Sequence, residues 1–155
     1  MKSFLLISYL LILQFLSKAN AQLSAEEKEK IKLEIIELNK QEREAFTNGE
    51  CDKVISFFDK NVSFYANGRK VPSLEFVHSF CKRIKRPFEK GAEINDQVYV
   101  LSESVVNNVK YIELPITSAD DKTRNVEVVT RIWKKTADGW KIVHFHSSVS
   151  AIPVQ

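Results

Sequence analysis

The stretch Thr130–His146, TRIWKKTADGWKIVHFH, combines strand-forming residues with a central turn. Apolar and aromatic residues alternate with polar ones on either side of the segment 136–139, which ends in Asp138-Gly139. Asp-Gly between two alternating runs is typical of a tight hairpin turn. The stretch therefore predicts two antiparallel strands, at about 123–135 and 139–148.

Alternation also assigns side chains to the two faces of this hairpin, because successive residues of a strand point to opposite sides. Arg131 shares a face with Trp133. Strict alternation places a second set on the opposite face: Thr130, Ile132, Trp140, Ile142, His144 and His146. Both faces are thus substantially apolar, which predicts that helices cover one and a second subunit covers the other. The alternative is a monomer in which the N-terminal segment or the C-terminal tail covers the second face.

The rest of the chain predicts helices first and strands afterwards. Ser24 and Glu27 form a capping-box pattern that opens a helix, and Asn48-Gly49 ends it. A shorter helix is expected at about 51–59, a strand at 61–68, and a third helix after Ser73. Two further strands, at 92–101 and 105–117, precede the hairpin and are separated by short polar turns. The expected fold is α+β, with helices packed on one face of a curved, mostly antiparallel sheet.

The N-terminus has the pattern of a secretory signal peptide. Lys2 precedes the apolar run Phe4–Leu16, and the segment closes with the small residues of Ala19-Asn20-Ala21. This run is shorter than the roughly 20 residues that a membrane-spanning helix needs, although an uncleaved anchor is the alternative. We therefore predict a signal peptide at 1–21, a single mature domain at 22–155, and secretion or residence in the lumen of the secretory pathway.

Cleavage lowers the formal net charge of the chain from +3 to +1, because it removes two lysines. Such a balanced charge argues against nucleic acid, and against a membrane surface, as a partner of the mature protein. The mature domain retains Cys51 and Cys81, which an oxidising compartment allows to pair, although two buried free thiols remain the alternative. Asn61 lies in an Asn-x-Ser sequon and is the candidate glycosylation site.

TRIWKKTADGWKIVHFHSS closely resembles the end of the association (hub) domain of calcium/calmodulin-dependent protein kinase II. The segments FTNGECDKV, FYANGRKV and LEFVHSF follow the order of that family, so the resemblance extends from about Ala25 to the C-terminus. It implies the cone-shaped nuclear-transport-factor-2-like fold of the SnoaL-like superfamily, in which a curved sheet surrounds a pocket. It also implies a homo-oligomer, at least a dimer. The family's pocket carries arginines that suit an acidic ligand. Arg131 matches one of them, whereas Glu113 and Ser147 stand where the family has two others.

The resemblance does not extend to the catalytic domain of the kinase. The Gly-rich phosphate loop, the His-Arg-Asp loop and the Asp-Phe-Gly motif of protein kinases are absent from the sequence. The function expected is therefore a secreted self-associating module that holds a small molecule in its cone. A small isomerase- or dehydratase-type enzyme is the alternative.

The pocket candidates are Tyr65, Tyr111, Glu113, Arg131 and Trp133. An ion pair between Glu113 and Arg131 would be structural, whereas a desolvated Glu113 without such a partner could act as a general base. His144 and His146 share a face, but a zinc site needs further ligands, so these histidines are expected in the core or an interface. The sequence thus predicts no catalytic residue, no metal site and no cofactor.

Overall fold

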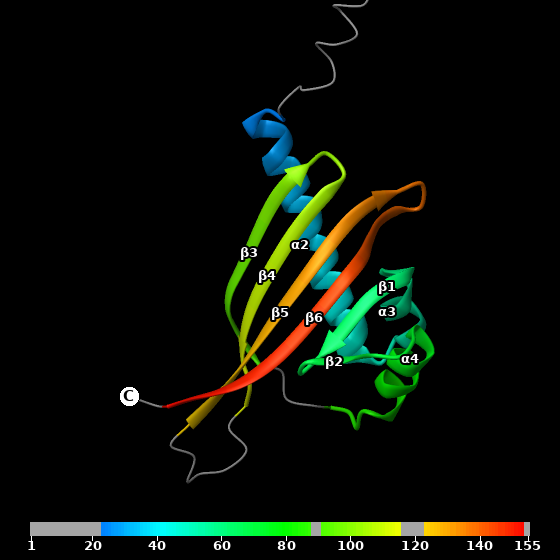
Figure 1. Cartoon of the computed structure of the whole chain (residues 1–155), viewed down its shortest axis with the longest axis vertical. Helices are drawn as coiled ribbons and strands as arrows, with labels where there is room; N and C mark the ends of the chain where they lie inside the picture. The colour runs from blue at the N-terminus through cyan, green and yellow to red at the C-terminus, as the bar shows by residue number, and fades with distance from the viewer. Residues whose placement is uncertain (1–22, 88–90, 116–122, 154–155) are drawn as a thin grey trace, which may run out of the picture.

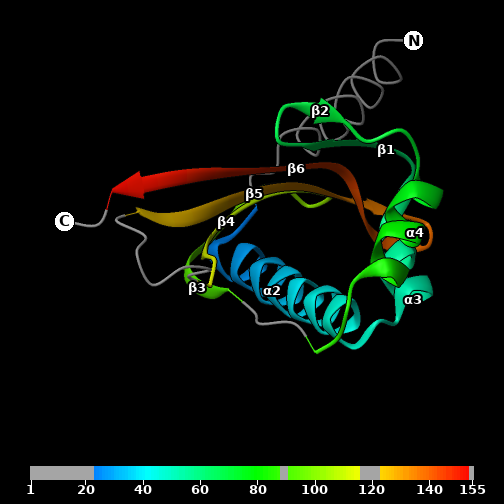
Figure 2. The same cartoon turned by 90° about the horizontal axis from the view of Figure 1, so that it is seen from below.

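The computed structural model describes residues 23–87, 91–115 and 123–153 of the chain. Within these ranges, helices pack on one face of a six-stranded sheet, which confirms the predicted α+β class (Figure 1). In chain order the elements are α2 (Ala25–Asn48), α3 (Cys51–Ser56), β1 (Phe58–Ala66), β2 (Arg69–Lys70), α4 (Leu74–Arg83), β3 (Ala92–Ser102), β4 (Val105–Glu113), β5 (Thr123–Thr136) and β6 (Gly139–Pro153). Figure 2 shows the sheet curving around α2, with α3 and α4 at one end of the curve.

The long helix α2 begins and ends where the sequence predicts. The Ser24 hydroxyl accepts a hydrogen bond from the Glu27 amide, and the Glu27 carboxylate accepts one from the Ser24 amide in return. The backbone and side-chain hydrogen bonds from Ser24 hold the pKa of Glu27 below its ordinary value. At the other end Gly49 has φ 77°, a left-handed conformation that glycine adopts at little cost.

The strands lie in the order β2-β1-β6-β5-β4-β3. Each pair of neighbours from β3 to β6 is antiparallel, as the short polar turns predict, whereas β1 pairs with β6 in parallel. The predicted helix at 51–59 is too long, since α3 ends at Ser56 and β1 begins at Phe58. Phe58 pairs with Ile142 of β6, and this tertiary contact outweighs the local helical spacing.

A β-bulge in β6 overturns part of the predicted outer face. Ile132 pairs with His144 and Trp133 pairs with Ile142, so Val143 is an extra residue in β6. The extra residue reverses the alternation, which leaves His144 on the outer face and turns Ile142 inward. Trp140 follows Ile142 to the inner face, and the two are 6% and 0% exposed. The placement of Trp140 and Ile142 on one face with the histidines is therefore wrong.

These inward residues complete the hydrophobic core between the sheet and the helices. Trp133 is fully buried and meets the Phe57 ring edge to face at 6.5 Å between centroids. Trp133, Trp140 and Ile142 belong to one cluster with residues of α2, α3, α4 and β4.

Helix α4 is linked to the neighbouring helices by a disulfide and by the hydrogen bonds of one arginine. A disulfide joins Cys51 of α3 to Cys81 of α4, with 5.8 Å between their Cα atoms. The guanidinium of Arg86 donates hydrogen bonds to the carbonyls of Phe46 and Thr47 near the end of α2, and to the carbonyl of Cys81 in the last turn of α4. A cation at two helix C-termini also interacts favourably with both helix dipoles. The C-terminal end of α4 is thereby joined to α3 and to the end of α2.

Candidate functional site

A cavity of about 450 Å³ lies between the inner face of the sheet and the helices α2 and α4. Its walls are mainly apolar, and they include phenylalanines from both helices and from β1 and β6: Phe46, Phe80, Phe58, Phe64 and Phe145. The polar side chains in the lining are Glu42, Arg43, Thr47, Lys110, Glu127, Arg131 and Ser147. Of the five predicted pocket candidates, this lining includes Arg131 but not Tyr65, Tyr111, Glu113 or Trp133.

Arg131 is the predicted pocket residue that the structure places in the cavity wall. It is 6% exposed, and its Nη2 atom lies 3.0 Å from Oε2 of Glu42 on α2. Its guanidinium also lies over the Phe145 ring, 5.2 Å from the centroid. Its Nε and Nη1 atoms are buried, and nothing in the described ranges accepts a hydrogen bond from them. Buried donors without acceptors are costly, so these two atoms mark a position where a ligand acceptor would be stabilised.

The predicted pair of Glu113 with Arg131 is wrong. Arg131 is in register with Asn108 of β4, so the even-numbered residues of β4 face the cavity and Glu113 faces away. Glu113 instead lies 3.5 Å from Arg124 on the outer face, where both side chains are partly exposed. The sequence pattern has a period of two, so it identifies faces only after the register between strands is known.

The same register removes two more pocket candidates. Tyr111 pairs with Val128 and Tyr65 pairs with His146, positions on the outer face of the sheet. Tyr65 also contacts His144, with 6.3 Å between ring centroids. Trp133 does face inward, but it packs in the core and is not part of the cavity lining.

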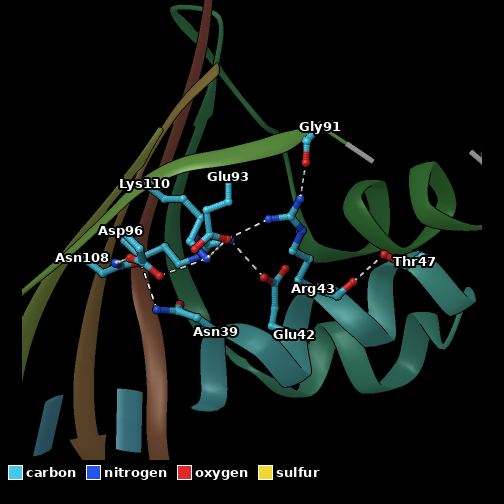
Figure 3. A network of polar contacts seen from close by, with 10 residues as sticks. Asn39, Glu42, Arg43, Thr47, Gly91, Glu93, Asp96, Asn108 and Lys110 are labelled. Carbon is cyan, nitrogen blue, oxygen red and sulfur yellow. Dashed lines mark hydrogen bonds and ion pairs between the residues drawn. The ribbon is translucent and has the colours of Figure 1, made fainter. Parts of the chain in front are cut away.

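A network of polar groups, buried at Asn39, Asn108 and Lys110 and exposed at Glu93, supports the cavity wall at β3 and β4 (Figure 3). The Lys110 ammonium lies 2.9 Å from Glu93 and 3.1 Å from Asp96, and its side chain is 5% exposed. Arg43 of α2 shares Glu93 at 2.8 Å and also donates a hydrogen bond to the Gly91 carbonyl. The two cations are thus paired with carboxylates on β3, which fixes the edge strand against α2.

The network continues through the side-chain amides of Asn39 and Asn108. Asn39 of α2 donates a hydrogen bond to Oδ1 of Asn108 at 3.1 Å, and Asn108 donates in turn to Asp96. Asn39 and Asn108 are 1% and 0% exposed. These hydrogen bonds link α2 to β4 and β3, whereas the buried Oδ1 atom of Asn39 accepts none from the described residues.

Sequence reasoning missed these residues, although the pattern carries a signal for them. Asn39 and Glu42 interrupt the apolar stripe of α2 that Ile35 and Ala45 define. Likewise Asn108 and Lys110 lie between Val106 and Ile112 on the inward face of β4. Polar residues at core-facing positions are expected to have buried partners or a function.

The outer end of the cavity carries a second polar pair. Glu127 of β5 accepts a hydrogen bond from the Ser147 hydroxyl of β6. Both residues are partly buried and line the cavity. Ser147 stands where the resemblance leads one to expect an arginine. Glu127 is therefore hydrogen-bonded to a neutral hydroxyl at this position and not to a guanidinium.

Four of the predicted interface residues do share the outer face of the sheet. Thr130 pairs with His146 and Ile132 pairs with His144, and each of the four is partly exposed in the single chain. Asn61 is exposed as well, in the part of β1 where the pairing with β6 is interrupted.

The described residues contain no group of three or more His, Cys, Asp or Glu side chains arranged to hold a metal ion. None of the helices in the described ranges combines the length and the hydropathy needed to cross a bilayer. The predicted signal peptide at 1–21 lies outside the described residues.

Known structures share this architecture. The crystal structure of the S. rosetta CaMKII hub is 23% identical, with a TM-score of 0.61, and the match covers 75% of this chain and 94% of the hub. An NTF2-like protein from Cytophaga hutchinsonii is 17% identical, with a TM-score of 0.62, over 78% of this chain and 98% of that one. An NTF-2 like protein from Shewanella oneidensis is 21% identical, with a TM-score of 0.55, over 74% and 95%. At these identities the likeness establishes the nuclear-transport-factor-2-like fold.

The family itself follows from the sequence model. No curated protein matches the chain. Residues 31–151, however, match the model of the calcium/calmodulin dependent protein kinase II association domain. Since this match covers most of the chain, the protein belongs to the calcium/calmodulin dependent protein kinase II association domain family.

Proposed function

We propose that this protein is a secreted, self-associating module that binds a small molecule in its cone pocket. The observation that carries the proposal is the pairing of Arg131 with Glu42 beside an open cavity. A closed ion pair supports a structural and binding role for the pocket arginine. Catalysis has less support, because Tyr65, Tyr111 and Glu113 lie across the sheet from the cavity.

Self-association is supported by the family and by the outer face of the sheet. The family is named for association, and one similar structure is named a hub. On this chain Ile132, Val128 and Tyr111 share the outer face with the two histidines, and all are partly exposed in the single chain. Burial of a large apolar side chain contributes about 1.5–3 kcal/mol. Burial of these side chains in a dimer interface would therefore offset part of the entropic cost of association.

The assembly is tested by size-exclusion chromatography with light scattering on the mature protein. We expect a dimer or larger species at micromolar concentration, and a monomer with an unchanged circular dichroism spectrum for Ile132→Glu. Val149→Glu is the matched control, since Val149 is 42% exposed and lies in register with the inward-facing Glu127. A wild-type monomer, or an Ile132→Glu protein that still assembles, would refute the proposed interface.

Ligand binding is supported by the size and lining of the cavity. Its volume of about 450 Å³ lies within the roughly 300–1,000 Å³ of small-molecule sites, which are mostly apolar with a few polar groups. The neutral dye Nile red, whose emission shifts to the blue in apolar surroundings, is the probe. Val129 lines the cavity while its neighbour Val128 faces outward, so the two positions form a matched pair.

We expect the blue shift of Nile red with the wild type and with Val128→Phe, and its loss with a folded Val129→Phe. An equal response from both variants would show that the dye binds elsewhere. Absence of any shift with the wild type would contradict the binding proposal.

Secretion rests on the pattern of residues 1–21, and the Cys51–Cys81 disulfide is compatible with an oxidising compartment. Expression in cultured secretory cells tests it. We expect the protein in the medium with Gln22 as its first residue, and a mass decrease on N-glycosidase treatment if Asn61 carries glycan. Retention in the cytosol, or an N-terminus far from Gln22, would contradict secretion.

A further inference from the structure

The charges around the pocket are almost balanced, with an excess of negative charge. Each basic side chain in the lining has a carboxylate within ion-pair distance. Glu93 pairs with both Arg43 and Lys110. Asp96 also pairs with Lys110, and Glu42 pairs with Arg131. Glu127 adds a fourth carboxylate, and among the described residues no cation lies within ion-pair distance of it. Three cations and four carboxylates give the pocket and its partners a formal charge of −1.

This balance disfavours an anionic ligand. A carboxylate that approached Arg131 would have to compete with Glu42, which already lies 3.0 Å from Nη2. It would also enter a low-dielectric site of net negative charge, where repulsion between like charges is strong. The unpaired Nε and Nη1 donors of Arg131 can instead be satisfied by a neutral oxygen.

The two polar ends of the pocket are well separated. Arg131 and Glu127 lie four residues apart on the same face of β5, which corresponds to about 13 Å between their Cα atoms. Val129 lines the cavity between them, and Phe145 and Ile112 are among the other apolar lining residues. Arg131 lies at the buried end, whereas Glu127 is partly exposed at the outer end. The pocket therefore offers donors at one end, an acceptor at the other, and an apolar middle.

We infer that the pocket takes an elongated, mainly apolar molecule that is neutral or carries one positive charge. A hydroxyl or carbonyl oxygen accepts hydrogen bonds from Arg131, or a hydroxyl or amine donates to Glu127, or one molecule does both. This selectivity is the opposite of the acid preference that several pocket arginines would produce. It rests on the proposed small-molecule function and specifies the chemical class of that ligand.

Three probes with the same octyl chain test the inference: octylamine, 1-octanol and octanoate, each competing with Nile red for the pocket. We expect octylamine and 1-octanol to displace the dye at concentrations at least about tenfold below octanoate, or ~1.4 kcal/mol. Octylamine should displace the dye at a lower concentration than 1-octanol, because its ammonium can pair with Glu127, and Glu127→Gln should remove this difference. Ser147→Arg, which places a cation beside Glu127, should shift the preference toward octanoate.

Glu113→Gln is the matched control, because it removes the same charge from the outer face of the sheet. It should leave the order of the three probes unchanged. Octanoate as the strongest competitor, or an unchanged order in Glu127→Gln, would overturn the inferred ligand class while leaving the pocket as a binding site. If the wild type gives no blue shift of Nile red, or if Val129→Phe does not abolish that shift, the small-molecule function itself is overturned.

Discussion

Replacement of Arg131 by methionine should destabilise the fold strongly, because it leaves the Glu42 carboxylate buried without its partner. The two side chains are 7% and 9% exposed, so solvent screens their interaction little. Removal of one partner from a buried ion pair typically costs about 3–5 kcal/mol. That loss is a large part of the roughly 5–15 kcal/mol by which a domain is stable.

The assay is urea unfolding followed by tryptophan fluorescence, since Trp133 and Trp140 are both buried in the core. With an m-value of about 2 kcal/mol/M, a loss of 4 kcal/mol lowers the midpoint by roughly 2 M. Arg124→Met is the matched control, because Arg124 pairs with Glu113 at the surface, where an ion pair contributes about 0–1 kcal/mol.

The double variant Glu42→Leu/Arg131→Met completes the cycle. It removes both charges and should recover most of the stability that either single change loses, because buried pairs are often replaceable by apolar residues. The reasoning is refuted if Arg131→Met costs less than about 1 kcal/mol, or if the double variant loses the sum of the two single losses.

Three further outcomes follow from the fold. Removal of the disulfide by Cys51→Ala/Cys81→Ala should cost about 3–4 kcal/mol in urea unfolding, since it opens a loop of 30 residues, and a reductant should have no effect on this variant. Arg86→Lys should cost about 1–3 kcal/mol by the same measurement, because one ammonium cannot reach carbonyls on both helices; an unchanged midpoint would contradict this. Ile142→Glu should abolish the folded circular dichroism spectrum, since the site is 0% exposed, whereas Ile132→Glu should retain it. A folded Ile142→Glu protein would show that the bulge is misplaced.

Local chemistry was sufficient to predict the bounds of α2 and the antiparallel order from β3 to β6. A serine that caps a helix, a glycine that ends one, and a two-residue turn act through contacts of a few residues, so the sequence displays them directly. The family resemblance added the cone, because the last two strands carry a distinctive pattern of Thr-Arg, Trp and His-Phe-His.

The same patterns failed where long-range geometry decides. One extra residue, Val143, reverses the alternation of β6 and sends Trp140 and Ile142 into the core, and no local preference distinguishes it from a regular strand residue. The sequence signal for a polar network was present at Asn39 and Lys110. A polar residue in an apolar stripe, however, does not indicate which distant residue it will contact.

The sequence by itself determined α2, the antiparallel strands from β3 to β6 and the family, because the patterns that indicate them lie in residues close together in the chain. Only the tertiary structure decided which polar groups meet in the pocket. Glu42 reaches Arg131 across 89 positions, whereas Glu113, which is much nearer in sequence, lies on the other side of the sheet. The physical reason is that a strand with a period of two has two equally regular registers, and only packing against α2 selects one of them.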